Sequence, residues 1–305
     1  MMNGSLTESA VLAEGLVKSY GKVKALGGVS LDVRHGETFG IIGPDGAGKS
    51  TLFRLLTSLL VPDSGSAQVE GLDTVKDYRE IRKIIGYMPG KFSLYQDLTV
   101  EENLTFFATL FGTTIDENYH LIEDIYKQIE PFKARMAGKL SGGMKQKLAL
   151  CCALIHKPKV LFLDEPTTGV DPVSRKEFWD MLGRLKNDGI TILVSTPYMD
   201  EAGRCDRIAL IRNGKFLTVN SPAGIIAEFP DRLYSVRSDR MHALLGDLRA
   251  YSGTVRAFSF GESVHLSTGD GFSEDDLRKF LQDRKHNNVE INAIQPSVED
   301  CFMRI

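Results

Sequence analysis

The sequence predicts an α/β domain with a mixed sheet, followed by a small α+β domain of ferredoxin-like pattern. Three observations lead to this fold class. A glycine-rich loop joins a strand-like run to a helix-like run near residue 43. Two apolar strand-like runs flank a helical run between residues 160 and 196, and the patterns past residue 226 follow the order βαββαβ. A chain of 305 residues is long enough for one large and one small domain.

Composition and charge restrict the classes of function. Hydrophobic residues make up 42% of the chain and charged residues 25%, as in a globular protein that buries its own core. The formal net charge is -3 and the Lys and Arg residues are scattered, so we expect no binding to nucleic acid. No run of about 18 apolar residues occurs, and MMNGSLTESA lacks the basic and apolar regions of a leader peptide. We therefore expect no direct insertion into a membrane.

The four cysteines form no recognisable metal or disulfide pattern. Cys151 and Cys152 lie in an apolar helical run, whereas Cys205 and Cys301 stand alone. These spacings match neither a zinc site nor a disulfide framework. We expect all four to be reduced and buried in the core.

The first third of the chain predicts an antiparallel layer that leads into a core strand. Strand-like runs LAEGLVKSYG, VSLDV and ETFGIIG are separated by turn signals such as Arg34-His35-Gly36. After Gly48, the run KSTLFRLLTSLL has helical apolar spacing and ends at the turn-rich VPDSGSA. The order is therefore strand, glycine loop, helix.

The middle of the chain predicts a helical subdomain over about residues 90–157, followed by a return to parallel strands. Thr99 and Glu102 have the spacing of a capping box at its first helix. The strands KVLFLD and GITILVS are separated by a helix over about 174–187, and a hairpin turns at Asn213-Gly214. We therefore assign residues 1–225 to the first domain and 226–305 to the second.

The segment that starts at Gly43 fits the phosphate-binding pattern G-x-x-x-x-G-K-S between a strand and a helix. Its glycines let backbone N–H groups surround phosphate oxygens, and the helix N-terminus adds positive potential. Lys49 would supply a full charge to the phosphates, and Ser50 would hold Mg²⁺. The predicted nucleotide contacts in this loop are Gly43, Pro44, Asp45, Gly46, Ala47, Gly48, Lys49, Ser50 and Thr51.

Two carboxylates follow the predicted strand VLFL. Carboxylates at the carboxyl end of a parallel strand face the ligand crevice of an α/β sheet. We expect Asp164 to bind Mg²⁺ and Glu165 to polarise the attacking water as the catalytic residue. Adjacent acids also end ordinary solvated strands, but the phosphate loop upstream favours the catalytic interpretation.

The run Leu140-Ser141-Gly142-Gly143-Met144 resembles the signature motif of ATP-binding cassette (ABC) proteins. Ser141 has the residue type of a helix cap, and Gly142 and Gly143 leave the first N–H groups of the helix open to an anion. An ordinary helix capped by serine would show the same residues. The resemblance spans about residues 10–225. It implies that Tyr20 stacks on adenine and that Asp171, in Gly169-Val170-Asp171-Pro172, belongs to the D-loop.

The resemblance also implies cofactors and partners. In the family, ATP and Mg²⁺ bind between two cassettes that close head to tail, so that the signature Ser141, Gly142 and Gly143 contacts the ATP of the opposing subunit. A separate transmembrane permease is the expected partner. This arrangement places the chain at the cytoplasmic face of the cell membrane.

Two positions depart from the family pattern. The family's glutamine after Pro89 is replaced by Gly90, and Gln96 lies six residues further on. The family's switch histidine after Thr196 is replaced by Pro197. Both missing groups contact phosphate, metal or water in the family, which implies a weakened hydrolytic site on this chain's own loop. Because the signature motif is intact, the expected partner is a second, non-identical cassette.

The segments LYQDLTVEENL, LSGGMKQKL, YMDEA and PSVEDCFMRI are most similar to ATPases of the drug and multidrug exporter class. This similarity predicts ATP hydrolysis coupled to export through the permease. Two alternatives stay open. One is a nucleotide-gated regulatory subunit with little turnover of its own. The other is a soluble cassette that acts outside transport, which the absence of a basic arm disfavours.

Overall fold

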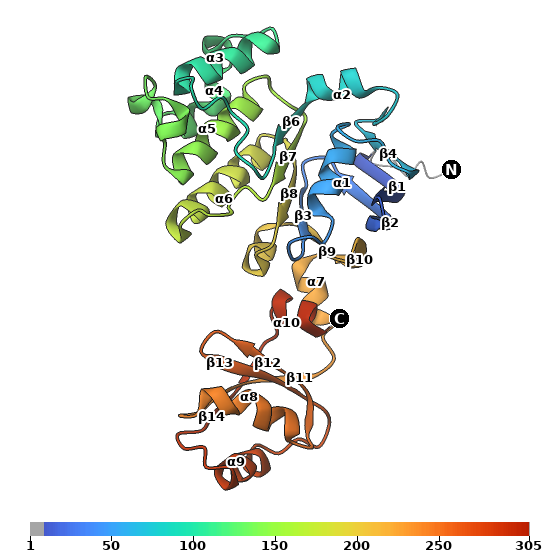
Figure 1. Cartoon of the computed structure of the whole chain (residues 1–305), viewed down its shortest axis with the longest axis vertical. Helices are drawn as coiled ribbons and strands as arrows, with labels where there is room; N and C mark the ends of the chain where they lie inside the picture. The colour runs from blue at the N-terminus through green and yellow to red at the C-terminus, as the bar shows by residue number, and fades with distance from the viewer. Residues whose placement is uncertain (1–8, 305) are drawn as a thin grey trace, which may run out of the picture. The chain divides into compact units, whose positions relative to one another are not determined.

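The structure of the protein, a computed structural model, describes residues 9–304 (Figure 1). The chain divides into two compact units, Met1–Ser221 and Pro222–Ile305. The predicted domain limits, 1–225 and 226–305, remain a prediction; the boundary between them falls inside α7 (Pro222–Ala227), the first helix of the second unit. Most of the N-terminal segment judged to lack a leader peptide lies outside the described residues.

The first unit contains the predicted mixed sheet. Its strand order is β10-β9-β3-β8-β7-β6, in which all neighbours are parallel except β9 and β10. The strands are β3 (Thr38–Ile42), β6 (Ile85–Met88), β7 (Val160–Asp164), β8 (Thr191–Thr196), β9 (Arg207–Arg212) and β10 (Lys215–Asn220). Every residue of β3, β7 and β8 is buried, as expected for parallel strands that are covered on both faces.

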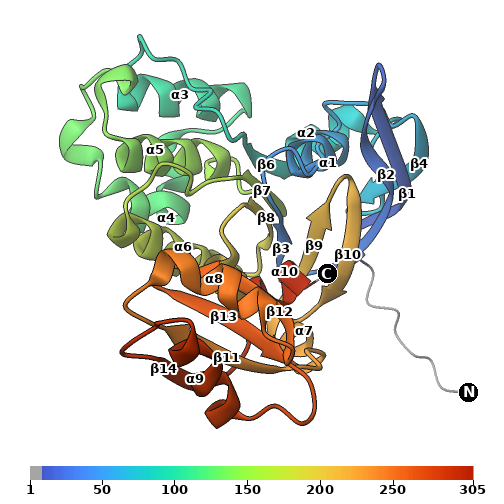
Figure 2. The same ribbon diagram turned by 60° about the horizontal axis from the view of Figure 1, so that its bottom comes forward.

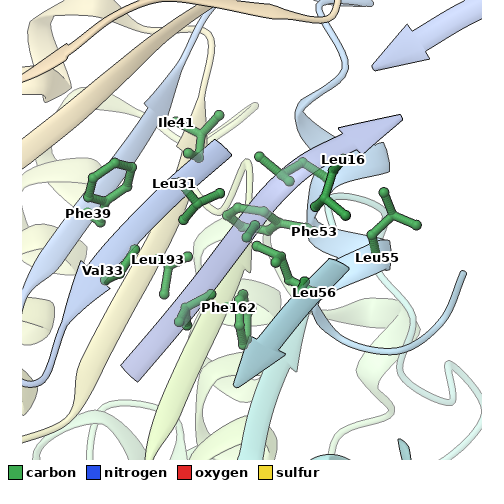
Figure 3. Close-up of a cluster of buried hydrophobic side chains, with 14 of the residues drawn as sticks. Leu16, Leu31, Val33, Phe39, Ile41, Phe53, Leu55, Leu56, Phe162 and Leu193 are labelled. Atoms are coloured by element: carbon green, nitrogen blue, oxygen red, sulfur yellow. The ribbon is translucent and has the colours of Figure 1, made fainter. Parts of the chain in front are cut away.

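The predicted antiparallel layer is a separate sheet of order β2-β1-β4-β5. Its strands are β1 (Ser9–Tyr20), β2 (Val23–Arg34), β4 (Ser64–Val69) and β5 (Leu72–Asp73). The helix α1 (Lys49–Leu56) contributes Phe53 to a cluster that also includes Leu16 and Leu31 of this layer and Phe162 of the mixed sheet (Figure 3). The rings of Phe53 and Phe162 meet edge to face, 5.8 Å apart. Burial of each such side chain stabilises the fold by about 1.5–3 kcal/mol, so α1 is held firmly behind the phosphate loop.

The predicted helical subdomain comprises three helices on one side of the strands in both views (Figures 1 and 2). They are α3 (Val100–Leu110), α4 (Ile115–Tyr126) and α5 (Gly142–Leu154). The capping box predicted for Thr99 and Glu102 is present, and a second one starts α4. The helix predicted from residue 174 is α6, which begins earlier and spans Pro172–Asn187. In the first unit, sequence reasoning did not identify α2 (Tyr78–Ile84), β6 or the short β5. It also interpreted VPDSGSA as a turn, whereas β4 begins inside this segment, at Ser64.

The second unit has the predicted βαββαβ order with antiparallel neighbours in the sheet order β12-β13-β11-β14. Its elements are β11 (Arg232–Arg237), α8 (Met241–Ala250), β12 (Thr254–Phe260), β13 (Ser263–Thr268), α9 (Glu274–Asp283), β14 (Glu290–Ile294) and the final helix α10 (Val298–Arg304). Leu244 and Leu248 of α8, like Leu277 and Leu281 of α9, are spaced by one helical turn and pack on the sheet. The unit therefore has a core of its own.

The expectation that the cysteines are buried is confirmed. All four cysteines are buried and free. Within residues 9–304, no helix is long and apolar enough to cross a membrane. The fold class predicted from the sequence is the one observed.

Candidate nucleotide-binding site

The phosphate loop connects β3 to α1, and two of its glycines are required by close backbone contacts. A Cβ atom on Gly43 would lie 2.2 Å from the carbonyl oxygen of Ile211. Gly48 has φ 108°, and a Cβ atom there would lie 2.5 Å from the carbonyl oxygen of Ala25. Gly46 also has a positive φ. These positions accept only glycine without strain, so the loop conformation follows directly from the sequence.

Lys49 is the first residue of α1 and is 3% exposed. Its Nζ donates to the carbonyl oxygens of Gly43 and Pro44, at 2.9 and 3.0 Å. It also forms an ion pair with Glu165, with 3.0 Å between Nζ and Oε1. The ammonium group therefore lies inside the loop and faces the predicted catalytic carboxylate.

Asp164 and Glu165 lie where β7 ends, next to the end of β8. Asp164 is 3% exposed, and its Oδ1 accepts a hydrogen bond of 2.5 Å from the hydroxyl of Ser195. Glu165 has φ 51°, which places a non-glycine residue in the left-handed region. Its N–H donates to both the carbonyl oxygen and the hydroxyl of Ser195, at 3.0 and 3.1 Å. A strained backbone held by several partners is typical of functional sites.

The residues around the acids fit a Mg²⁺ ion that takes most of its ligands from a nucleotide and water. Among residues 9–304, no group of three or more His, Cys, Asp or Glu side chains could hold a metal by itself. Asp164 uses one carboxylate oxygen for Ser195, which leaves the other oxygen for a ligand. Mg²⁺ at phosphate sites takes one or two protein oxygens in addition to phosphate and water, so a carboxylate together with the hydroxyl of Ser50 suits it.

Gly90, the first departure from the family pattern, lies directly against the acidic strand end. A Cβ atom on Gly90 would lie 3.1 Å from the carbonyl oxygen of Asp164 and 3.8 Å from its carboxyl carbon. Gln96 accepts a backbone hydrogen bond from Gly138 and is exposed, so its described contacts tie it to the helical subdomain. Gly90 therefore has no side chain to occupy the position beside Asp164 that a glutamine would fill.

Tyr87 of β6 brings a hydroxyl group near these acids. Burial is the main cause that raises the pKa of Tyr87 to about 12, and the negative charge of Asp164 adds to the effect. The positive charge of Arg54 opposes it. Tyr87 is therefore neutral at physiological pH.

Pro197, the second departure, follows a buried polar cluster at the end of β8. Glu201 is 3% exposed and accepts hydrogen bonds from the hydroxyls of Thr196 and Thr167, at 2.5 and 2.8 Å. Arg175 pairs with the same carboxylate at 3.2 Å, and its guanidinium lies 4.3 Å from the centre of the Tyr198 ring. The cluster therefore joins the segment after Glu165 to the segment that carries Pro197.

The signature residues lie at the start of α5. Ser141 is exposed and caps the helix, because its hydroxyl accepts from the N–H of Met144 at 3.3 Å. A Cβ atom on Gly142 would lie 3.6 Å from the carbonyl oxygen of Gly169, so the signature and the D-loop are neighbours. In both views α5 and α1 lie on different sides of the strands (Figures 1 and 2). The signature thus does not complete this chain's own phosphate loop.

Asp171 and Tyr20 lie at the ends of other elements, Asp171 at the start of α6 and Tyr20 at the end of β1. Asp171 caps α6 by accepting from the N–H of Ser174 at 3.0 Å, and this bond, with that from the Ser174 hydroxyl, lowers the pKa of the Asp171 carboxyl. Tyr20, the last residue of β1, is 46% exposed and leaves its ring free for stacking. The structure therefore brings Lys49 into contact with Glu165, next to Asp164, whereas Tyr20, Asp171 and the signature belong to other elements.

These features define a phosphate-loop protein with a buried lysine opposite two carboxylates, the arrangement of nucleoside-triphosphatases. The family model described as ABC transporter matches residues 26–168. The Nod factor export ATP-binding protein I of Rhizobium sp. (strain N33) is 35% identical over 304 residues, 98% of each chain. The daunorubicin resistance ATP-binding protein DrrA2 of Streptomyces coeruleorubidus is 35% identical over 97% of this chain and 94% of its own. The chain belongs to the family of ABC transporter ATP-binding proteins.

A third relative is longer than this chain. The probable multidrug ABC transporter ATP-binding protein YbhF of Escherichia coli (strain K12) is 38% identical over 98% of this chain, which spans 52% of that protein's length. The chain thus covers about half of this relative.

Solved structures support the same fold. The CbiO1 protein of Clostridium perfringens, part of an ABC transporter complex, matches 72% of this chain and 92% of its own, with a TM-score of 0.64 and 29% identity. An ATP-binding cassette solved as a dimer in a post-hydrolysis state with ADP and phosphate matches 69% of this chain and 98% of its own, with a TM-score of 0.63 and 26% identity.

Proposed function

We propose that this chain binds and hydrolyses ATP as the energy-coupling subunit of an ABC exporter. The observation that carries the proposal is the ion pair, 3.0 Å long, between Glu165 and the buried Lys49 of a loop whose glycines are required by the backbone. This contact joins the phosphate-binding charge to the carboxylate that would handle the attacking water. Family membership supports the same activity, because relatives of this chain are named ATP-binding proteins of export, of drug resistance and of a multidrug ABC transporter.

Chemistry at the site begins with an exchange of partners. Phosphate oxygens enter the loop and bind Lys49, which releases the carboxylate of Glu165. Glu165 then orients a water molecule and accepts its proton as the water oxygen bonds to the γ-phosphorus and the bond to the ADP oxygen breaks. Mg²⁺, when bound, would supply positive charge that offsets the negative charge of the phosphates during transfer. Ser50 and Asp164 are the residues that would hold it.

The exposed signature at Ser141, Gly142 and Gly143 supports a second cassette as partner. Its helix, α5, lies on the other side of the strands from α1, so an ATP bound by another subunit is the anion that fits its N-terminus. Gly90 and Pro197 remove two polar groups from this chain's own site, which favours a non-identical partner that carries them. In such a pair, the competent site consists of the partner's loop and this chain's signature.

An apolar groove of 450 Å³ supports a permease as the other partner. It lies between β6 and the helices α3 and α5, and Tyr87, Pro89, Leu94, Phe107 and Leu110 are among its lining residues. Leu110 is 63% exposed, an arrangement that a partner's apolar segment would cover. Pro89 lines the groove and is followed by Gly90, which lies against Asp164. A partner segment bound in the groove could therefore change the position of the acids. Binding there would hold the chain at the cytoplasmic face of the membrane.

Export is the direction that the named relatives favour, since they include Nod factor export and daunorubicin resistance proteins. The test is steady-state ATP turnover by the chain, alone and with a candidate permease in detergent. We expect slow turnover alone, stimulation by the permease, and loss of turnover in Lys49→Ala. A chain that binds ATP but shows no turnover in either setting would instead be a regulatory subunit.

A further inference from the structure

Ser195 connects the two carboxylates of the site through one side chain. It is fully buried in β8, where it pairs with Asp164 of the parallel strand β7. Its hydroxyl donates to Asp164 Oδ1 at 2.5 Å and accepts from the N–H of Glu165 at 3.1 Å. Its carbonyl oxygen accepts from the same N–H at 3.0 Å. Ser195 thus contacts the predicted metal ligand and the backbone of the predicted catalytic residue at once.

The hydroxyl has one hydrogen, and Asp164 receives it. This bond fixes the rotation of a carboxylate that is 3% exposed and directs its second oxygen away from Ser195. Without the bond, a buried carboxylate oxygen would lose its partner, which is costly in a site of low dielectric. The orientation of the metal ligand therefore depends on Ser195.

The Glu165 backbone depends on the same residue. With φ 51°, Glu165 adopts a conformation that residues with a Cβ atom avoid, so surrounding bonds must hold it there. Both atoms that accept from its N–H belong to Ser195. The other end of the segment is held independently, since the hydroxyl of Thr167 donates to the buried Glu201. Loss of the Ser195 hydroxyl should thus disturb the acids and leave the rest of the segment in place.

We infer that Ser195 is a positioning residue that orients Asp164 toward Mg²⁺ and couples this ligand to the placement of Glu165. The inference rests on the proposed function, and it goes beyond it by assigning a role to a residue outside the predicted nucleotide and metal contacts. Groups that orient a metal ligand in this way typically contribute 10- to 100-fold to metal affinity or activity.

The experiment compares ADP affinity in chelator with ADP affinity in Mg²⁺, using the full chain and isothermal titration. For Ser195→Ala we expect ADP affinity in chelator within about twofold of the parent. The gain from Mg²⁺, meaning the factor by which Mg²⁺ increases ADP affinity, should be at least about tenfold smaller than in the parent. ATP turnover should fall by a similar factor. Ser195→Thr retains the hydroxyl and should recover most of the gain.

Thr191→Val is the matched control. Thr191 is a buried residue of the same strand, and its hydroxyl accepts from the N–H of Gly36, at the other end of β8 from the acids. This variant removes a hydroxyl of β8 without touching Asp164, so its gain from Mg²⁺ should match that of the parent. An unchanged gain in Ser195→Ala, or an equal loss in Thr191→Val, would overturn the role of Ser195. A parent chain that binds no ADP at all would overturn the proposed function as well.

Discussion

Glu165→Gln tests the partner exchange at Lys49 most closely. In the structure the Lys49 side chain is 2% exposed, and its ammonium lies 3.0 Å from the carboxylate of Glu165, a side chain that is 22% exposed. Phosphate oxygens that enter the loop must compete with this carboxylate for the same charge, and they also meet its negative charge. A neutral amide of the same shape removes both obstacles. We therefore expect Glu165→Gln to bind nucleotide more tightly while it hydrolyses ATP more slowly.

The size of the effect follows from the kind of bond that is exchanged. A hydrogen bond to a charged group contributes about 1.5–3 kcal/mol, compared with about 1 kcal/mol for a neutral one. An amide at residue 165 retains the weaker bond, so the difference is about 1.3 kcal/mol at the middle of these ranges. Since about 1.4 kcal/mol corresponds to tenfold, ADP should bind about tenfold more tightly to the variant.

The assay is titration of the full chain with ADP in chelator, which excludes hydrolysis and metal from the comparison. Asp45→Asn is the control for removal of one negative charge near Lys49. The Asp45 carboxylate lies 3.8 Å from Lys49 Nζ but is 88% exposed, and exposed pairs contribute little. The ADP affinity of Asp45→Asn should stay within about threefold of the parent. ADP affinity of Glu165→Gln within twofold of the parent would refute the competition between carboxylate and phosphate.

Three further predictions concern the loop, the second unit and its response to acid. Lys49→Ala should abolish ATP binding while circular dichroism shows a folded chain; affinity within about twofold of the parent would contradict the phosphate-loop assignment. A chain truncated after Ser221 should still bind ATP, because no predicted nucleotide or metal contact lies beyond it; loss of binding in folded truncated protein would contradict this. In the second unit, the hydrogen bond with His286 is the main cause that lowers the pKa of Asp247. The contribution of Asp247 to the free energy of unfolding is present above its unfolded pKa of about 3.9 and is lost as pH falls through the lower folded pKa. In urea unfolding, Asp247→Asn should therefore lose less stability than the parent between about pH 4 and lower pH. An equal loss in parent and variant would argue against this role.

Features encoded by neighbouring residues were predictable from the sequence. The phosphate loop is one, because Gly43 and Gly48 are required by backbone contacts that only glycine permits. The capping box of Thr99 and Glu102 is another, since both partners lie within one helical turn. The order βαββαβ of the second unit also follows from local patterns and was observed.

Features that depend on distant pairings were not predictable. Ser195 meets Asp164 only because β8 lies beside β7, a pairing across 31 residues that no local pattern reveals. The one available signal was the polar residue Ser195 near the end of the apolar run GITILVS. Glu201 lies in the polar run YMDEA, a pattern typical of an exposed segment. In the structure it is buried and contacts Thr167, Thr196 and Arg175. The strand β6 was missed because its four residues are too short for a periodic pattern.

ATP turnover by the assembled transporter tests the central claim, that this chain's signature serves a competent site on a non-identical partner cassette. The exposed Ser141 caps α5 whereas the acids lie at the end of β7, so each can be changed alone. We expect Ser141→Arg to stop turnover, because it blocks the partner's site, and Glu165→Gln to reduce it far less. The isolated chain should turn over slowly. An isolated homodimer that hydrolyses ATP near the enzyme median of about 10 per second would contradict the claim.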